Sequence, residues 1–253
     1  MIDTHCHLTD PRLLAQLETV LSRAAAAGVS GIVTIGTQPA DWDAVIKLVS
    51  DRSNIRCAFG VHPNHCHEVD PAEIPRLREI QKHPSVVALG EMGLDYHHKF
   101  APRDQQAKFL EAQLAIAAEI NRPVVIHCRE AVDDCLAILK NFPVVAVFHC
   151  FTGTRDEADR ILAAGHYLGF TGVVTFKNGQ PLRDIAAAAP ADRILVETDA
   201  PYLSPEPMRK QKTNEPSLVV HTADVVAKSR GLSRAQLDVL TTKNASRFYR
   251  CEF

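Results

Sequence analysis

The run Ile2-Asp3-Thr4-His5-Cys6-His7 opens the chain and is the first of eight short runs of β-branched and apolar residues. A longer stretch whose spacing predicts an amphipathic helix follows each run, and this alternation is typical of βα units and a parallel sheet. The expected strands are Ile2–His7, Gly31–Gly36, Ile55–His62, Val86–Glu91, Val124–His127, Val144–His149, Tyr167–Thr171 and Ile194–Asp199. The expected helices include Leu13–Ala27, Asp41–Ser50, Arg103–Ile120, Asp134–Asn141, Asp156–Ala164 and Leu182–Ala188.

Length and composition decide how these units are arranged. The chain has 253 residues, 46% of them hydrophobic and 23% charged, which allows a large core and excludes a disordered or collagen-like protein. A (β/α)8 barrel uses about 250 residues as one domain. Because no linker, charge run or change in composition interrupts the eight units, the sequence predicts an α/β fold of this kind. We expect one TIM-barrel domain over residues 1–253 rather than an open doubly wound sheet.

Charge, cysteines and apolar runs limit the classes of partner and compartment. The 28 basic and 30 acidic side chains give a net charge of −2, which excludes a chromatin-type DNA-binding protein but not an enzyme that binds a few phosphates. Seven cysteines without a C-x-x-C spacing predict reduced thiols. No apolar run approaches the roughly 20 residues of a membrane span, and the N-terminus lacks a secretory signal. We therefore expect a cytoplasmic monomer without an obligate protein partner.

Histidines and carboxylates gather at the ends of the expected strands. In a TIM barrel these ends form the rim that carries the active site. His5 and His7 are two residues apart, so both imidazoles lie on one face of the first strand and Cys6 lies on the other. The same alternation turns Cys128 and Cys150 away from the site. The other groups at strand ends are His62, Glu91, His127, His149 and Asp199.

This set of side chains predicts a metal centre. Four imidazoles and two carboxylates exceed the three protein ligands of a single catalytic zinc ion, so we expect two divalent ions, and nitrogen and oxygen ligands suit Mg, Mn or Zn. A cysteine-ligated zinc ion is the alternative, and any lone histidine here also fits a hydrogen-bonded structural role. The expected ligands are His5, His7 and Asp199 on one ion, His127 and His149 on the other, and Glu91 between them.

Other residues near the rim are candidates for contact with a substrate. Arg129 and Lys177 are expected to bind phosphate oxygens, with surface ion pairs as the alternative. Tyr202 and Arg209 combine an aromatic face with positive charge, which suits a DNA end but equally a solvated loop. For His62 the roles of ligand, substrate contact and structural residue all stay open. The histidines expected to be solvated loop residues are His65, His67, His97 and His98.

Several motifs, in the same order, resemble the TatD family of metal-dependent deoxyribonucleases over essentially the whole chain. They are Asp3-Thr4-His5-Cys6-His7-Leu8, Gly60-Val61-His62-Pro63, Gly90-Glu91-Met92-Gly93-Leu94-Asp95-Tyr96, Val125-Ile126-His127-Cys128-Arg129, His149-Cys150-Phe151-Thr152-Gly153, Glu197-Thr198-Asp199-Ala200-Pro201-Tyr202-Leu203 and Asn214-Glu215-Pro216. The resemblance implies an amidohydrolase-like TIM barrel with two divalent ions and 3′ to 5′ exonuclease activity on DNA. It carries the family's metal residues onto the same six positions and makes Asp199 the acceptor of a proton from the attacking water.

The expected activity has two rivals. We expect cleavage of single-stranded or frayed 3′ ends of DNA, because the chain lacks a basic groove for duplex. Hydrolysis of a C–N or ester bond, as in an amidohydrolase or an aminoacyl-tRNA deacylase, is the first alternative. Superfamily relatives of that kind often bridge their ions with a carboxylated lysine, whereas no lysine ends a strand here. A non-catalytic metal-binding protein is the second alternative.

Overall fold

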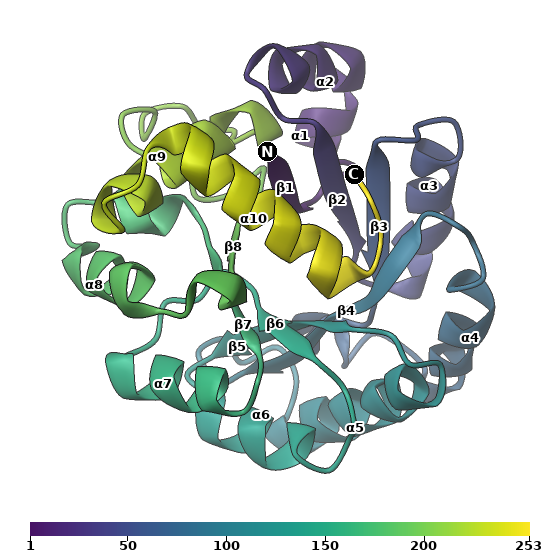
Figure 1. Cartoon of the computed structure of the whole chain (residues 1–253). Helices are drawn as coiled ribbons and strands as arrows, with labels where there is room; N and C mark the ends of the chain where they lie inside the picture. Colours follow the sequence, from purple (N-terminus) through teal and green to yellow (C-terminus); the bar gives the residue numbers. More distant parts are fainter. The chain divides into compact units, whose positions relative to one another are not determined.

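The structure, a computed structural model, describes residues 1–253. Its strands are β1 (Ile2–Cys6), β2 (Gly31–Gly36), β3 (Ile55–Phe59), β4 (Val86–Asp95), β5 (Val124–Arg129), β6 (Ala146–Phe148), β7 (Tyr167–Phe170) and β8 (Ile194–Val196). They belong to one eight-stranded sheet whose order follows the chain from β1 to β8 (Figure 1). A parallel bridge between Cys6 and Ala200 also joins β1 to the residues after β8. This order is that of a (β/α)8 barrel, which confirms the predicted fold class.

Helices separate the strands as expected, but their bounds differ from the predictions. They are α1 (Pro11–Leu14), α2 (Leu17–Ala26), α3 (Pro39–Val49), α4 (Leu77–Ile80), α5 (Arg103–Glu119), α6 (Val132–Leu139), α7 (Arg155–Ala163), α8 (Gln180–Ala188), α9 (Val219–Ser229) and α10 (Arg234–Tyr249). The helix expected over Leu13–Ala27 is divided into α1 and α2. No helix combines the length and the apolar character that crossing a membrane requires.

The chain divides into two compact units, residues 1–34 with 150–253 and residues 35–149. The single domain expected over residues 1–253 stays a prediction. In the first unit α10 packs against β1 and β8 (Figure 1). The Tyr249 hydroxyl donates a hydrogen bond to the Thr4 carbonyl oxygen over 2.9 Å, and the Asn244 amide donates to the Ile194 carbonyl oxygen over 2.9 Å. These bonds fix β1, which carries His5, and β8, which leads to Asp199.

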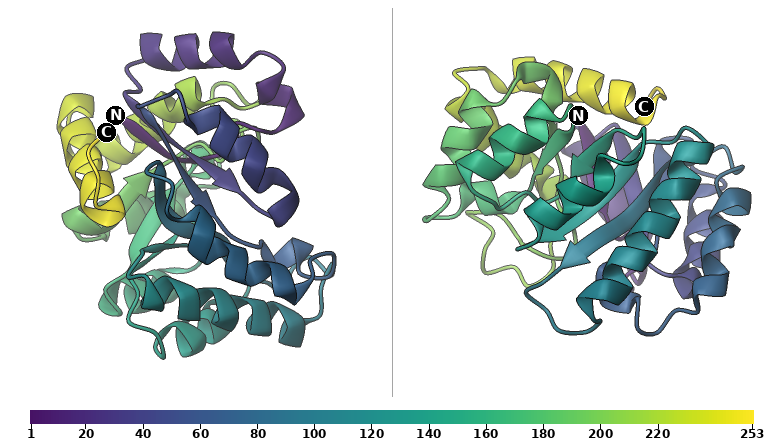
Figure 2. Two further views of the ribbon diagram at one scale, coloured as in Figure 1. Left: turned by 90° about the vertical axis from the view of Figure 1, so that its right-hand side faces the viewer. Right: turned by 90° about the horizontal axis from the view of Figure 1, so that it is seen from below.

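In the second unit α5 lies along β4 and supports the loops that carry its histidines (Figure 2). Two glutamines of α5 are buried, an unusual position for this residue type unless its amide is hydrogen-bonded. Gln113 accepts a bond from the Val61 amide over 2.7 Å, beside His62. Gln106 accepts one from the Asp95 amide over 2.8 Å, at the end of β4. The helix thereby holds two strand ends in place.

The observed strand ends correct several predicted boundaries. Strands β1, β3, β6 and β8 end before His7, His62, His149 and Asp199, so these four side chains project from the loops that follow. Strand β4 instead continues past Glu91, because it pairs with β5 as far as Asp95 and Arg129. The predicted end of β4 at Glu91 was therefore wrong.

Candidate metal centre

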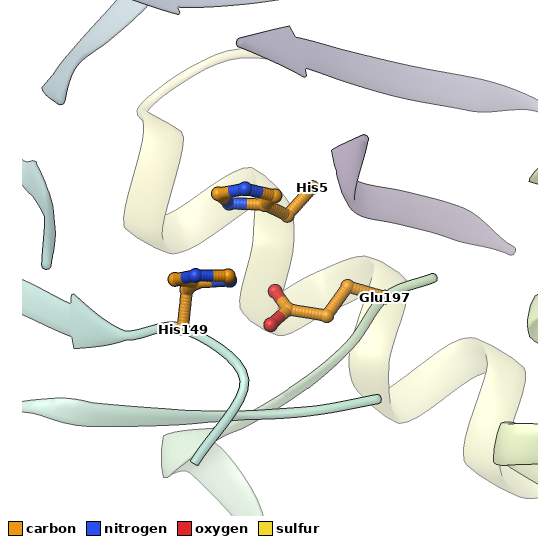
Figure 3. Close-up of side chains that lie close together, drawn as sticks. All are labelled: His5, His149 and Glu197. Atoms are coloured by element: carbon orange, nitrogen blue, oxygen red, sulfur yellow. The ribbon is translucent and has the colours of Figure 1, made fainter. Parts of the chain in front are cut away.

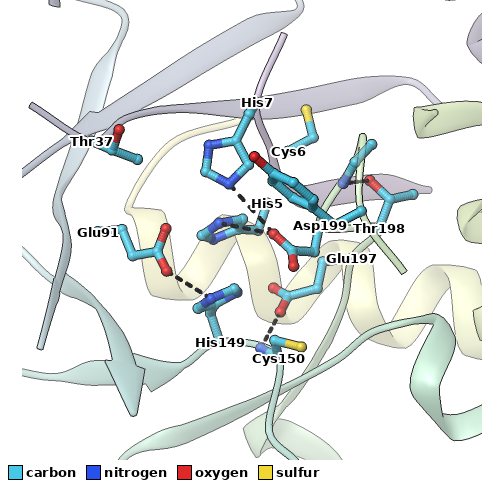
Figure 4. A network of polar contacts seen from close by, with 12 residues as sticks. His5, Cys6, His7, Thr37, Glu91, His149, Cys150, Glu197, Thr198 and Asp199 are labelled. Atoms are coloured by element: carbon cyan, nitrogen blue, oxygen red, sulfur yellow. Dashed lines mark hydrogen bonds and ion pairs between the residues drawn. The ribbon is translucent and has the colours of Figure 1, made fainter. Parts of the chain in front are cut away.

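His5 of β1, His7 just after this strand and one carboxylate after β8 form a group in the first unit. His5 is fully buried and His7 is partly exposed, and their rings are edge to face with centroids 5.1 Å apart. Asp199 Oδ1 lies 3.4 Å from His7 Nε2 and 3.8 Å from His5 Nε2 (Figure 4). Alternation along β1 thus places both imidazoles beside one carboxylate, as predicted from their spacing.

The backbone presents Asp199 in an uncommon conformation. Its φ of 56° lies in the left-handed region, which aspartate and asparagine enter more readily than other side chains. Its amide donates to the His5 carbonyl oxygen over 2.9 Å, which continues the pairing of β8 with β1. This left-handed residue lies shortly after β8, where it turns the chain away from the sheet and leaves the carboxylate beside the histidines.

Glu197 is a further buried carboxylate in this unit, and it was not predicted as a site residue from the sequence. Its side chain lies near His5, with a carboxylate oxygen within 4.8 Å of a ring nitrogen (Figure 3). It accepts hydrogen bonds from the Cys150 amide over 2.6 Å and the Thr4 hydroxyl over 3.2 Å (Figure 4). Because two donors hold it, Glu197 is fixed in position next to the His5 ring. The Glu197-Thr198-Asp199 motif contained this residue, but only its last member ended a predicted strand.

The second unit has one buried carboxylate among three imidazoles. Glu91 is 3% exposed, and its Oε1 lies 2.8 Å from His149 Nε2, 3.0 Å from His127 Nδ1 and 3.3 Å from His62 Nε2. Burial alone raises the pKa of Glu91, but the neighbouring histidines outweigh it and hold the pKa well below its usual range. Burial lowers the pKa of His62 to about 4. An ionised carboxylate thus lies at the centre of this group.

Two glycines shape the backbone around Glu91. The pairing of β4 with β5 shifts register between Leu89 and Met92, as in a β-bulge. A Cβ atom on Gly90 would lie 2.3 Å from the Val125 carbonyl oxygen, and both glycines that flank this stretch have positive φ. Only glycine permits this approach of the two strands. The Gly90-Glu91-Met92-Gly93 motif therefore sets where the carboxylate projects.

Asp95 was not predicted, and it holds His127 from the other side. Its buried carboxylate lies 3.1 Å from His127 Nε2 and 2.8 Å from His98 Nδ1, and it accepts bonds from the backbone amides of His97 and His98. Burial alone lowers the pKa of His127, but the bonds to Asp95 and Glu91 raise it to about 9. A carboxylate on the second nitrogen of a ligand histidine fixes its ring and its tautomer. His98 was expected to be only solvated, and instead it anchors this carboxylate.

The residues predicted to contact a substrate are in different surroundings. His62 lies in the Glu91 group, where its Nδ1 accepts a bond from the Asn64 amide and its Nε2 is directed at the carboxylate. Tyr202 is 47% exposed, and its ring centroid lies 6.0 Å from that of His7. Arg129 and Lys177 are exposed. Arg209 stacks on the Phe176 ring, with its guanidinium carbon 3.8 Å from the centroid.

The donor atoms of both groups fit divalent ions. Two ligands of one tetrahedral zinc ion lie about 3.3 Å apart, since each bond to the metal is about 2.0 to 2.1 Å long. The separation from His7 to Asp199 is 3.4 Å, longer than a usual hydrogen bond, whereas Glu91 lies at hydrogen-bond distances of 2.8 Å from His149 and 3.0 Å from His127. Each group offers imidazole nitrogens and carboxylate oxygens, and no cysteine belongs to either. This donor set suits Zn or Mn as well as Mg.

Comparison with known proteins points to one family. A family model described as TatD related DNase matches residues 2–250. The chain is 37% identical to the uncharacterized metal-dependent hydrolase YabD of Bacillus subtilis over 99% of both chains. It is 39% identical to the 3′-5′ ssDNA/RNA exonuclease TatD of Erwinia tasmaniensis, covering 98% of this chain and 99% of that protein.

Solved structures agree on the fold. The crystal structure of YJJV, a TatD homologue from Escherichia coli, matches with a TM-score of 0.93 and 27% identity, covering 99% of this chain and 98% of that chain. The N-acetyl-D-glucosamine-6-phosphate deacetylase of Mycobacterium smegmatis matches with a TM-score of 0.66 at 16% identity, covering 99% of this chain and 75% of that one. The second likeness concerns the fold alone, an amidohydrolase-like TIM barrel.

Proposed function

Since the chain belongs to the TatD family of metal-dependent hydrolases, we propose that it is a 3′–5′ exonuclease that hydrolyses phosphodiester bonds of single-stranded DNA. The observation that carries the proposal is the pair of ligand groups, one around Asp199 and one around Glu91, each built from nitrogen and oxygen donors. The relative from Erwinia tasmaniensis is named a 3′-5′ ssDNA/RNA exonuclease, which supports the choice of substrate. The exposed Tyr202 ring beside His7 supports a base at the 3′ end.

The proposed metal ligands follow from the fold. In a (β/α)8 barrel the active site lies at the carboxyl ends of the strands, and the residues proposed as ligands lie at or just after such ends. We assign His5, His7 and Asp199 to one divalent ion and His127 and His149 to a second, with Glu91 between them. When bound, such ions lower the pKa of water and draw charge from the phosphoryl oxygens.

The protein's own side chains then have separate tasks in the proposed reaction. Asp199 accepts the proton of the attacking water, since its carboxylate lies beside His7 at a partly exposed position. Glu91 stays ionised among its histidines and supplies negative charge to the centre. Asp95 keeps the His127 ring directed at Glu91. Arg129, Lys177 and Arg209 are proposed to meet phosphates of the strand, and His62 is proposed to contact the substrate at Glu91.

The rival chemistry is hydrolysis at a carbonyl carbon. Water activated at a two-ion centre would attack carbonyl and phosphoryl groups alike, so the fold does not distinguish the two reactions. The bridging position is assigned here to Glu91, and no strand ends in a lysine. This favours the phosphodiesterase.

The test is degradation of a 5′-labelled single-stranded oligonucleotide with Mg or Mn, beside a Glu91→Ala variant and a chelator control. We expect a ladder that shortens from the 3′ end with the wild-type enzyme and no cleavage in either control. Elemental analysis measures the metal content of the wild type and the variant, so it tests the ligand assignment independently of activity. An oligonucleotide that stays intact with every metal would overturn the nuclease, and ester and amide substrates would then be screened.

A further inference from the structure

An open pocket lies where β4 ends and α5 begins, beside the positioning residue Asp95. Its volume is about 460 Å³, within the range of about 300 to 1,000 Å³ that small-molecule sites occupy. Asp95 forms part of the pocket lining, and its carboxylate also lies 3.1 Å from His127 Nε2. The pocket therefore adjoins the Glu91 group within the same unit. Its other principal lining residues are Tyr96, His98, Lys99, Phe100 and Arg103.

The pocket presents aromatic rings to solvent. Phe100 is 57% exposed, although burial of a phenylalanine side chain normally contributes about 1.5 to 3 kcal/mol. The His98 ring stacks near it with centroids 5.8 Å apart and planes 25° apart, and the His67 ring lies 6.4 Å away at 15°. Both histidine rings thus lie nearly parallel to the ring of Phe100, which keeps an exposed aromatic surface. Every nucleobase can stack on such a surface.

Positive charge lies next to these rings. Lys99 and Arg103 both line the pocket, and neither forms an ion pair with a carboxylate. The Arg103 guanidinium carbon lies 3.9 Å from the centroid of the Tyr96 ring, whose hydroxyl is anchored on Asp134 over 2.6 Å. The carboxylate in the pocket wall, Asp95, is already engaged by two histidines. Two cations are therefore available to an anionic ligand.

We propose that this pocket binds one nucleotide of the single-stranded substrate, with its base stacked on Phe100 and its phosphate facing Lys99 and Arg103. The inference rests on the proposed function and adds a binding subsite to it. An aromatic face with adjacent, uncompensated cations matches a base joined to a phosphate, whereas an apolar ligand would leave both cations unpaired. His67 and His98, expected from the sequence to be only solvated, are part of the stacking surface.

The test measures binding of a 5′-fluorescein-labelled oligothymidylate with cleavage-resistant phosphorothioate linkages to the full-length enzyme with Mg, by fluorescence anisotropy. Phe100→Leu keeps an apolar side chain but removes the ring, and we expect about tenfold weaker binding. Phe100→Tyr keeps the ring and should restore the wild-type affinity. The double variant Lys99→Gln with Arg103→Gln should lower the slope of log affinity against log salt by about 1.4, the change expected for two phosphate contacts on a single strand.

The matched control is Lys82→Gln, an exposed lysine of the same unit that precedes β4 at the opposite end of the strand. It should bind like the wild type at every salt concentration. If the wild type shortens an unmodified oligonucleotide while the Phe100→Leu and double variants bind as it does, the subsite is refuted and the proposed function stands. If the wild type neither binds nor shortens any oligonucleotide, the proposed function itself is refuted and the subsite with it.

Discussion

Among the individual side chains, Asp95 is a positioning residue: it holds the proposed ligand His127 and is not itself proposed as a ligand. It acts through His127, whose Nε2 lies 3.1 Å from the Asp95 carboxylate while its Nδ1 lies 3.0 Å from Glu91. Asp95→Asn keeps the size of the side chain and removes the charge, so the enzyme should bind divalent ions about 10 to 100 times more weakly. Calorimetric titration of the metal-free protein measures this. Asp134→Asn, which changes a carboxylate that bonds only the surface Tyr96 hydroxyl, is the matched control and should not alter metal affinity.

The backbone conformation at Asp199 allows its proposed role as proton acceptor to be tested in a folded variant. Asparagine tolerates the left-handed φ of 56° almost as well as aspartate, so Asp199→Asn should fold and should melt within a few degrees of the wild type. It cannot accept the proton, and kcat should fall by about 10² to 10⁴. Steady-state kinetics together with thermal melting measures both quantities. A variant that turns over at the wild-type rate would exclude Asp199 from this role.

At the scale of elements, the loop after β8 is held by Asn214. This buried residue donates from its amide to the Thr198 carbonyl oxygen over 2.9 Å and to the Tyr202 carbonyl oxygen over 2.6 Å, on both sides of Asp199. Asn214→Asp puts a carboxylate opposite both carbonyls and should lower the free energy of unfolding by about 2 to 3 kcal/mol. It should also lower kcat, because Asp199 is released. Urea unfolding and kinetics test this, with the surface substitution Asn141→Asp as the control.

The strands and helices also show how much of the fold and of the candidate site the sequence predicts. Eight alternating units predicted the fold, and histidines at or next to strand ends predicted most of the ligand groups. Asp95 was missed because the Gly90-Glu91-Met92-Gly93 bulge lets β4 continue past Glu91, which ordinary strand alternation does not show. Helices α9 and α10 were not predicted, although Ser233 and Gln236 form a capping box at the start of α10. Which carboxylate lies beside which histidine ring depends on the register between strands that are distant in the sequence. No local sequence pattern predicts these pairings.

For the whole molecule, the ligand groups couple metal binding to stability. An ion that binds the folded chain alone stabilises it by about 2.7 kcal/mol at 100 times its dissociation constant. For a chain of this length that corresponds to a melting temperature about 5 to 10 °C higher. Removing metal with a chelator should lower the melting temperature by this amount, and re-addition should restore it. Glu91→Ala should respond less, since it lacks the central carboxylate of its group. Equal responses would show that the stabilising ion binds elsewhere.

Acid should destabilise the whole fold through a histidine outside the ligand groups. His166 is 7% exposed in front of β7, and burial lowers its pKa from 6.5 to about 4. Between these two values the unfolded chain binds more protons than the folded chain, so stability from this residue is complete above pH 6.5 and is lost as the pH falls toward 4. The shift corresponds to a loss on the order of 2 to 3 kcal/mol. His166→Gln and His166→Phe both remove the group that binds the proton. The free energy of unfolding of the wild type, relative to that of either variant, should therefore fall by about 2 to 3 kcal/mol as the pH is lowered from 6.5 to 4. Urea unfolding at a series of pH values measures it, and a difference that stays constant from pH 7 to pH 4 would show that His166 is not the residue through which acid acts.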